Sequence, residues 1–105
     1  MSSFEDYLAR HWAWSLGAFG SGRQTNGILE HLGKEIAEIR AKPDDLIEWV
    51  DVMILAFDGY LRHGGSVDGL IRDLEAKQAE NLLRRWPGPG DGEHAVEHLR
   101  DDEKG

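Results

Sequence analysis

Hydrophobic residues recur every three or four positions in four successive segments of the chain, and this period predicts α-helices. Each segment begins after a capping or turn residue and ends near a glycine or proline. The predicted helices run from Phe4 to about Phe19, from about Thr25 to Ala41, from Asp44 to His63, and from Val67 to about Trp86. We therefore expect an all-α protein, a four-helix bundle joined by short loops.

Helix-capping and helix-stopping residues set these boundaries. The starts carry Thr25 or Asn26, Pro43-Asp44-Asp45 and Ser66, and the ends carry Gly20-Ser21-Gly22, Lys42-Pro43, Gly64-Gly65 and Pro87. Residues 87–92, with the sequence PGPGDG, are expected to form a flexible linker, and residues 94–100 are a candidate for two further helical turns. The expected organisation is a helical domain over residues 1–87, followed over residues 88–105 by a linker and a short C-terminal helix or tail.

The third segment also has a strand interpretation, because its residues 50–55, VDVMIL, are rich in β-branched side chains. Its length favours a helix. Residues 46–61 contain no proline and only one glycine, whereas strands usually span about three to ten residues. No other part of the sequence offers a strand to pair with it, which supports the all-α prediction.

Composition and charge limit the possible partners. The chain has 105 residues, enough for one small domain whose core would benefit from a second copy. Twenty acidic residues against twelve basic ones give a net charge of −8, and no basic run is present. Polymeric DNA or RNA is therefore not expected as a partner, because binding to it requires basic side chains that neutralise phosphates.

The sequence gives no sign of a membrane segment or of thiol chemistry. Its longest unbroken apolar run, Val52–Phe57, is far shorter than the roughly 20 residues of a membrane helix. Glu5 and Asp6 stand where a signal peptide needs basic residues, so we expect a cytoplasmic location and no membrane partner. The absence of cysteine excludes disulfides, thiolate metal sites and thiol nucleophiles.

Three acidic residues interrupt the most apolar segment. At about 100° per residue, Glu48, Asp51 and Asp58 fall with Arg62 on or beside one narrow polar strip, and apolar side chains cover the rest of the helix. A helix that is apolar nearly all round is normally buried, so the strip is expected to face the bundle interior or a crevice. A buried carboxylate is ordinarily paired, protonated or bound to a metal.

The second predicted helix carries a matching pair, Glu35 and Glu38, at and beside the edge of its apolar stripe. If the second and third helices form an antiparallel hairpin, these two acids can face Glu48 and Asp51. Four carboxylates that close repel one another unless a cation lies among them, and hard oxygen ligands suit Mg²⁺ or Mn²⁺. The alternative is that all four lie on solvated helix faces, where the same spacing is common.

The fourth predicted helix supplies the opposite charge. Lys77 and Asn81 lie on the side of its apolar stripe, and Arg84 lies on the same flank. Acids that hold a metal, together with a cationic row, are what a polyphosphate would require. Alternatively, Lys77 lies along the edge of the core with its charge in water, and Asn81 caps a neighbouring backbone group.

The order of these residues resembles the MazG-like all-α nucleoside triphosphate pyrophosphohydrolases, and most closely their small branch of dATP/dGTP diphosphohydrolases, common in bacteria and phages. A single Glu-x-x-Glu is not specific, but the ordered set is, and the resemblance covers almost the whole chain. Its central motifs are Lys34-Glu35-x-x-Glu38, Glu48-x-x-Asp51 and Lys77-x-x-x-Asn81-x-x-Arg84-x-Trp86-Pro87. It extends to Trp14-Ser15, residues 19–23 and 27–29, Asp58-Gly59 and residues 95–100.

The resemblance implies a Mg²⁺ site, with Mn²⁺ as a possible substitute. Its ligands would be Glu35, Glu38, Glu48 and Asp51. One of the two glutamates of the second helix, Glu35 or Glu38, would be the catalytic base, and Glu38 is the preferred candidate because it lies at the flank. Lys34 stands where the broader superfamily usually has a glutamate, which leaves the number of metal ions open.

The resemblance also implies substrate-binding roles. Lys77, Asn81, Arg84 and Lys34 would bind the polyphosphate or another part of the substrate. A pocket for the base or sugar would draw on Trp14, Ser15, Phe19 and Asp58. The alternatives are that the aromatic residues pack in the core or at a dimer contact, and that Asp58 pairs with Arg62 four residues later. His11, His31 and His63 carry no readable signal, and His94 and His98 give only a weak suggestion of zinc.

The sequence thus predicts a Mg²⁺-dependent hydrolase that converts a nucleoside triphosphate, and purine deoxynucleotides such as dATP and dGTP in particular, into a monophosphate and pyrophosphate. A homodimer or homotetramer is expected to close the crevice. The alternative from another class is a non-catalytic helical module for dimerisation or nucleotide sensing. Within the enzyme class, the alternative substrates are dUTP or a damaged nucleotide.

Overall fold

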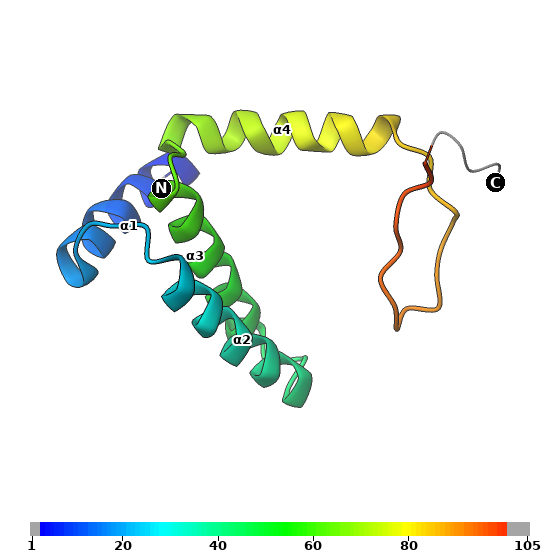
Figure 1. Ribbon diagram of the computed structural model, residues 1–105, viewed down its shortest axis with the longest axis horizontal. Helices are drawn as coiled ribbons and strands as arrows, with labels where there is room; N and C mark the ends of the chain where they lie inside the picture. The colour runs from blue at the N-terminus through cyan, green and yellow to red at the C-terminus, as the bar shows by residue number, and fades with distance from the viewer. Residues whose placement is uncertain (1–2, 101–105) are drawn as a thin grey trace. The chain divides into compact units, whose positions relative to one another are not determined.

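The computed structural model describes residues 3–100 and contains four helices in that range (Figure 1). They are α1 (Phe4–Phe19), α2 (Thr25–Ala41), α3 (Leu46–Arg62) and α4 (Val67–Leu83). The described residues form no strand, only an isolated bridge between Arg85 and Leu99. The all-α prediction is confirmed. Over the same residues, no helix is long and apolar enough to cross a membrane.

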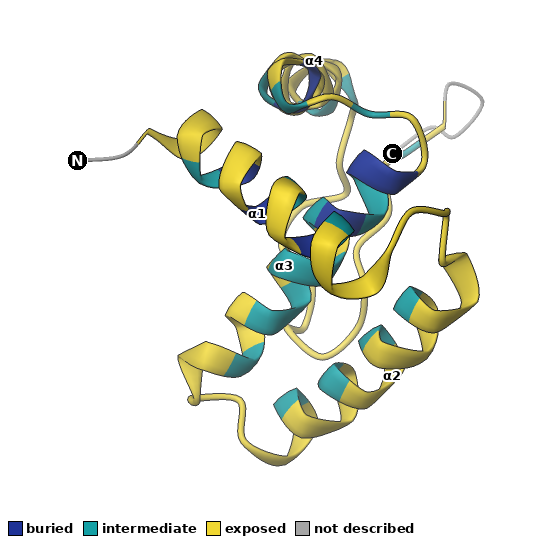
Figure 2. Ribbon diagram, turned by 90° about the vertical axis from the view of Figure 1, so that its left-hand side faces the viewer, coloured by how far each residue is buried: buried dark blue, intermediate teal, exposed yellow. Residues whose placement is uncertain are grey.

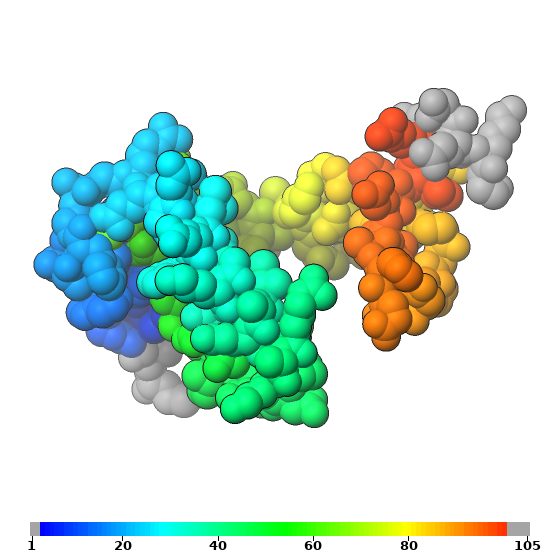
Figure 3. Space-filling model, turned by 60° about the horizontal axis from the view of Figure 1, so that its bottom comes forward, coloured from blue at the N-terminus to red at the C-terminus, as the bar shows by residue number. Residues whose placement is uncertain are grey.

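The chain divides into two compact units, one up to Leu70 and one that begins at Ile71. In the first unit α2 and α3 run side by side in opposite directions and α1 packs against α3 (Figure 1). The surfaces of α2 and α3 adjoin in the space-filling view, where they are coloured cyan to green (Figure 3). The predicted hairpin of the second and third helices is therefore present.

The buried side chains of the first unit lie in α1, in the last turns of α3 and at the start of α4 (Figure 2). Leu8, Leu61 and Leu70 are the buried hydrophobic residues, and Phe4 meets Phe57 edge to face with ring centroids 5.4 Å apart. Helix α2 has no fully buried residue. Apolar burial therefore joins α1 to the C-terminal half of α3 and leaves much of the α2–α3 hairpin exposed.

Side chains cap three of the four helices. The hydroxyl of Ser3 accepts from the Asp6 amide, the carboxylate of Asp45 from the Ile47 amide, and the hydroxyl of Ser66, as predicted, from the Gly69 amide. Because Asp45 is the cap, α3 begins at Leu46 and not at Asp44.

The predicted cap of α2 is wrong. Gln24, and not Thr25 or Asn26, precedes the helix, in the left-handed region with φ of 50° and with no side-chain cap hydrogen bond. The side-chain amide of Gln24 (Nε2) instead donates to the Phe19 carbonyl, and the Thr25 hydroxyl contacts Nε2 of His63. The capping group that the sequence suggested is thus engaged with the end of α3.

The second unit differs from the prediction at the end of α4 and in the tail. Helix α4 ends at Leu83, and beyond it the Leu99 amide donates to the Arg85 carbonyl and the Arg85 guanidinium donates to the Arg100 carbonyl. Residues 94–100 form no helical turns. Leu99 instead forms an isolated bridge with Arg85, so the two candidate helical turns are absent.

A buried arginine connects α3 to α1 and to the loop after it. Arg62 donates five hydrogen bonds: Nε to the Asp58 carboxylate at 2.7 Å, Nη1 to the carbonyls of Gly20 and Gly22, and Nη2 to the carbonyl and hydroxyl of Ser15. Every N–H of the guanidinium is therefore used. Gly20 and Gly22 have φ of 78° and 120°, which glycine adopts at little cost and which lets both carbonyls accept from one side chain.

Asp58 is the anionic centre of this network. It accepts from Arg62, lies 3.1 Å from Nε2 of His11, and is 8% exposed. Burial raises the pKa of Asp58, but hydrogen bonds from Ser15 and Arg62, the charge of Arg62 and the contact with His11 outweigh it, so the net pKa is lowered. Asp58 is therefore held as a carboxylate that is paired inside the fold.

We expect Arg62→Gln to lower the free energy of unfolding by about 3–5 kcal/mol, because removing one partner of a buried ion pair leaves the other charge uncompensated. Urea unfolding followed by tryptophan fluorescence measures the change. Arg10→Gln, at an exposed position of α1, is the matched control and should stay within about 0.5 kcal/mol of the wild type. Equal, small effects of the two substitutions would contradict the structural role of Arg62.

Candidate functional site

Three glutamates from the α2–α3 hairpin converge on one point. Glu35 and Glu38 project from α2 and Glu48 from α3, and one carboxylate oxygen of each lies within 4.8 Å of the others. The i, i+3 spacing puts the first two on one face of α2, and the antiparallel packing brings the first turn of α3 to that face. The structure thus brings together three of the four acids that the sequence singled out.

Asp51, the fourth acid, lies close by but is not part of this group of three. Its negative charge contributes to the raised pKa of Glu35, and its side chain lines a cavity together with Glu35. It is half-buried, one turn after Glu48 on α3. Asp51 is therefore near the three glutamates but outside the group whose oxygens lie within 4.8 Å of one another.

The three glutamates have no counter-charge among the described residues that would explain their proximity. The Oε2 atoms of Glu35 and Glu48 are buried and have no hydrogen-bond partner. Carboxyl contacts with Glu38 and Glu35, which are favourable only if a proton is shared, raise the pKa of Glu48 to about 7, with burial and repulsion adding to the effect. Burial is the largest cause of the raised pKa of Glu35.

This donor set fits a hard divalent cation. All the groups are carboxylates, which Mg²⁺ and Mn²⁺ prefer over nitrogen and sulfur. A cation among them would occupy the unpaired oxygens and remove the repulsion that raises the two pKa values. No other group of three potential metal ligands occurs in residues 3–100, so His94 and His98 gain no support as zinc ligands. His94 instead contacts Asp91, and His98 packs against Trp86.

A cavity of about 290 Å³ adjoins the acids. All four residues predicted for a base or sugar pocket line it, together with two of the acids. Its lining includes Trp14, Ser15, Phe19, Glu35, Asp51 and Asp58. Trp14 and Phe19 meet edge to face at 5.4 Å and are 59% and 60% exposed. Two accessible aromatic rings therefore line the same cavity as the two acids.

Ser15 and Asp58 have a different character from the aromatic residues. Ser15 is 1% exposed, its hydroxyl accepts from Arg62, and its hydrogen bond with Asp58 helps to lower the pKa of Asp58. Both side chains line the cavity, but their polar groups already have protein partners. The pairing of Asp58 with Arg62, which the sequence left as an alternative, is present.

A second cavity of about 340 Å³ shares four lining residues with the first and adds a cation. The shared residues are Phe19, His31, Leu55 and Asp58. Lys34, predicted to bind substrate, lines only the second cavity. A basic side chain is therefore available on the face of α2 next to the acidic group.

The histidines at this site were not identified from the sequence. His11 is buried against Asp58, and His31 lines both cavities one turn before Glu35. The position of His31 in the sequence was the only signal available, since an i, i+4 relation to Glu35 puts it on the same helix face. Nothing in the sequence linked His11 to Asp58, which is 47 residues away.

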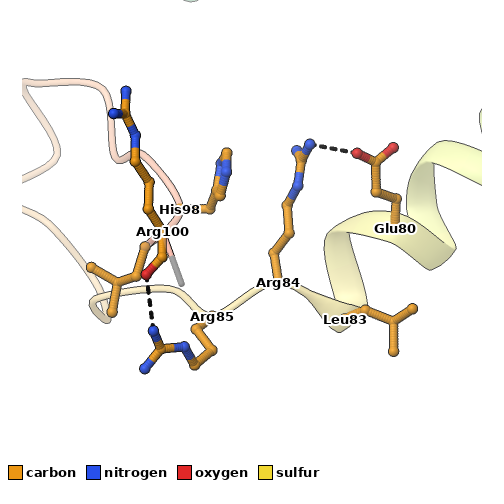
Figure 4. A pocket seen from close by; sticks show the side chains of 7 residues that line it. Glu80, Leu83, Arg84, Arg85, His98 and Arg100 are labelled. Atoms are coloured by element: carbon orange, nitrogen blue, oxygen red, sulfur yellow. Dashed lines mark hydrogen bonds and ion pairs between the residues drawn. The ribbon is translucent and has the colours of Figure 1, made fainter. Parts of the chain in front are cut away.

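In the second unit, two of the three residues predicted to bind the substrate share one acidic partner. Lys77 and Arg84 both pair with Glu80, and Arg84 also donates to the side-chain oxygen of Asn81 at 3.2 Å. A pocket of about 330 Å³ lies beside Glu80 and Arg84 and is also lined by His98 and Arg100 (Figure 4). The three predicted residues thus lie on one face of the end of α4.

Comparison with known proteins gives concordant results. The family model described as dATP/dGTP pyrophosphohydrolase matches residues 7–104. The Eaa protein of Salmonella phage P22 is 40% identical over 61 residues, which are 58% of this chain and 19% of that protein, so the chain spans about a fifth of that relative.

One solved structure extends the comparison to three dimensions. It is a cyanophage S-2L MazG-like pyrophosphohydrolase bound to dGDP and three catalytic Mn²⁺ ions per active site, 28% identical to this chain. The match has a TM-score of 0.74 and covers 95% of this chain and 100% of that one. Because the family model covers nearly the whole sequence and the fold agrees, this chain belongs to the dATP/dGTP pyrophosphohydrolase family.

Proposed function

We propose that this protein is a divalent-metal-dependent hydrolase that converts purine deoxynucleoside triphosphates, dATP and dGTP, into the monophosphate and pyrophosphate. The observation that carries the proposal is the group of three glutamates within 4.8 Å, with two unpaired buried oxygens, next to a cavity flanked by aromatic rings. Membership of the pyrophosphohydrolase family and the dGDP bound to the structural relative support the choice of substrate.

Glu35, Glu38, Glu48 and Asp51 would hold Mg²⁺, or Mn²⁺ in its place. The structural relative has three Mn²⁺ ions per active site, which supports more than one ion here. When bound, such ions polarise the α-phosphate, lower the pKa of a coordinated water and stabilise the attacking and leaving oxygens. Asp51, set apart from the group of three, is the ligand that would extend the site to a further ion.

The glutamates also supply the base. Glu38 is the exposed member of the group, whereas Glu35 and Glu48 are half-buried, so Glu38 is the most accessible of the three to a water. It would accept the proton of the attacking water, while Glu35 orients the site as a ligand. The water oxygen bonds to the α-phosphorus, the bond from that phosphorus to the α–β bridging oxygen breaks, and pyrophosphate leaves with the bonding electrons.

The remaining residues would bind the substrate. Trp14 and Phe19 would stack on the purine ring, because both are accessible at the edge of the cavity. Ser15 and Asp58, which are buried, would form part of the lining of the base or sugar pocket. The polyphosphate would be bound by the basic and amide side chains Lys34, Lys77, Asn81 and Arg84.

A homodimer or homotetramer is part of the proposal. Large apolar side chains at the start of α3 are exposed: Leu46, Ile47, Trp49, Val50 and Met53. Contiguous apolar surface of this kind on a small protein is typical of a protein interface. A second copy packed on this face would bury it close to the acidic group, whose Glu48 and Asp51 lie on the same helix.

Product analysis tests the reaction. With Mg²⁺ and dGTP or dATP, we expect equal amounts of the monophosphate and pyrophosphate, separated by ion-exchange chromatography. Water labelled with ¹⁸O should place the label in the monophosphate, because the attack is at the α-phosphorus. Orthophosphate together with a diphosphate would contradict the mechanism, and a preference for dUTP in the same panel would replace the substrate class.

Glu48→Gln should reduce turnover by roughly 100-fold or more, because it removes a charged metal ligand. It should also abolish the rise in melting temperature that Mg²⁺ gives the wild type. Asp44→Asn, an exposed acid just before α3, is the matched control and should retain both properties. If Glu48→Gln changed neither, the non-catalytic dimerisation or nucleotide-sensing module would be the better description.

The metal-free protein should become less stable as the pH rises. The pKa of Glu48 is raised from 4.5 to about 7, so its proton favours the folded state below pH 4.5, and this contribution is lost as the pH rises through about 7. Melting temperatures in a chelator, measured from about pH 5 to 8, should fall more steeply for the wild type than for Glu48→Gln. Identical slopes would show that Glu48 is not the titrating group.

A further inference from the structure

The cations at the end of α4 are already bound to an anion of the same helix. One oxygen of Glu80 accepts from Nη2 of Arg84 at 2.5 Å, and the other accepts from Nζ of Lys77 at 3.4 Å. Glu80 is therefore shared between two positively charged side chains, one turn away on either side. Nη1 of Arg84 completes the arrangement with its hydrogen bond to Asn81.

The pocket beside Glu80 is rich in basic residues. Arg84, Arg85, His98 and Arg100 line it together with Leu83 and Leu99, and Glu80 is the only carboxylate among the lining residues that the structure describes. Arg84, His98 and Arg100 extend to the same side in Figure 4, while the Arg85 guanidinium turns the other way to the Arg100 carbonyl. The Arg84 guanidinium that an incoming anion would contact is already paired with the Glu80 carboxylate.

We propose that Glu80 is an internal competitor of the polyphosphate: its carboxylate occupies the phosphate-binding positions of Lys77 and Arg84 and must be displaced when the substrate's phosphates bind. The inference rests on the proposed function for the role of these two cations. A carboxylate resembles a phosphate in offering two oxygens to separate donors, so the contacts of Glu80 are those that two phosphate oxygens would make. Glu80 thereby weakens substrate binding and favours release of pyrophosphate.

An opposite role is conceivable, in which Glu80 holds the two cations in place and so strengthens binding. The benefit of positioning Lys77 and Arg84 is smaller than the repulsion between Glu80 and the ligand, which argues against this role. The three side chains are 57%, 50% and 28% exposed for Lys77, Glu80 and Arg84, and exposed ion pairs order their partners only weakly. Repulsion between the Glu80 carboxylate and a ligand with three or more negative charges acts on every charge of the ligand, so it exceeds the benefit of positioning.

The experiment compares Glu80→Gln with the wild type in binding of inorganic tripolyphosphate, measured by isothermal titration calorimetry in Mg²⁺. Glutamine keeps a side-chain oxygen for Arg84 but removes the charge. We expect the Kd to fall about fivefold, the factor that one charge–charge interaction across about 4 Å of water carries. The KM for dGTP should fall similarly, with kcat changed by less than about twofold if release of product does not limit the rate.

Glu75→Gln on the same helix is the matched control. It removes the same charge from an exposed position five residues earlier, on a different face of α4, so it corrects for the change in net charge. It should change the Kd by less than about twofold at 0.15 M salt, where charges beyond about 8 Å are screened. The double variant Glu80→Gln, Arg84→Gln should lose most of the gain, because the competition acts through Arg84.

A Kd for Glu80→Gln equal to or higher than that of the wild type would overturn the inference. Equal gains from Glu80→Gln and Glu75→Gln would overturn it too, since a general charge effect would then suffice. These results are separable from failure of the proposed function, which would appear as absence of triphosphate turnover by the wild type itself. Tripolyphosphate binding is measurable in either case.

Discussion

The repulsion among carboxylates is the interaction on which this site depends. Helix α2 contributes two glutamates one turn apart, α3 contributes the third, and the hairpin keeps their oxygens within 4.8 Å. This repulsion adds to burial, the largest cause of the raised pKa of Glu35, and to the contacts with Glu38 and Glu35 that are the largest causes of the raised pKa of Glu48. The same repulsion would be relieved by a divalent cation among the carboxylates, which is why this donor set fits Mg²⁺ or Mn²⁺.

The protein treats its two groups of buried acid in opposite ways. Asp58 is surrounded by donors from Arg62, Ser15 and His11, and its pKa is lowered, so it is a structural anion. Glu35 and Glu48 have buried oxygens without partners, so they are available to a ligand. The three carboxylates lie on the same two helices, but Asp58 has hydrogen-bond partners within the fold, and Glu35 and Glu48 each have an oxygen without one.

The two groups are nevertheless connected through one cavity. Arg62 holds the carbonyls of Ser15, Gly20 and Gly22, which fixes the end of α1 and the loop behind Phe19. Trp14 and Phe19 line the same cavity as Glu35 and Asp51. The buried ion pair thus helps to position the end of α1, from which Trp14 and Phe19 reach the cavity.

The sequence by itself determined the elements that depend on local preference. Hydrophobic period and stop signals predicted four helices to within a few residues, and the i, i+3 spacing of the acids predicted their shared faces, because both follow from the geometry of a single helix. Tertiary structure decided the rest. The pairing of Asp58 with His11 joins residues 47 apart, the Thr25 hydroxyl contacts His63 while neither Thr25 nor Asn26 is the N-cap of α2, and Leu99 pairs with Arg85 in a segment where helical turns were expected. Each of these outcomes is a competition between a local preference and a distant partner, and the strength of a distant contact cannot be read from neighbouring residues in the chain.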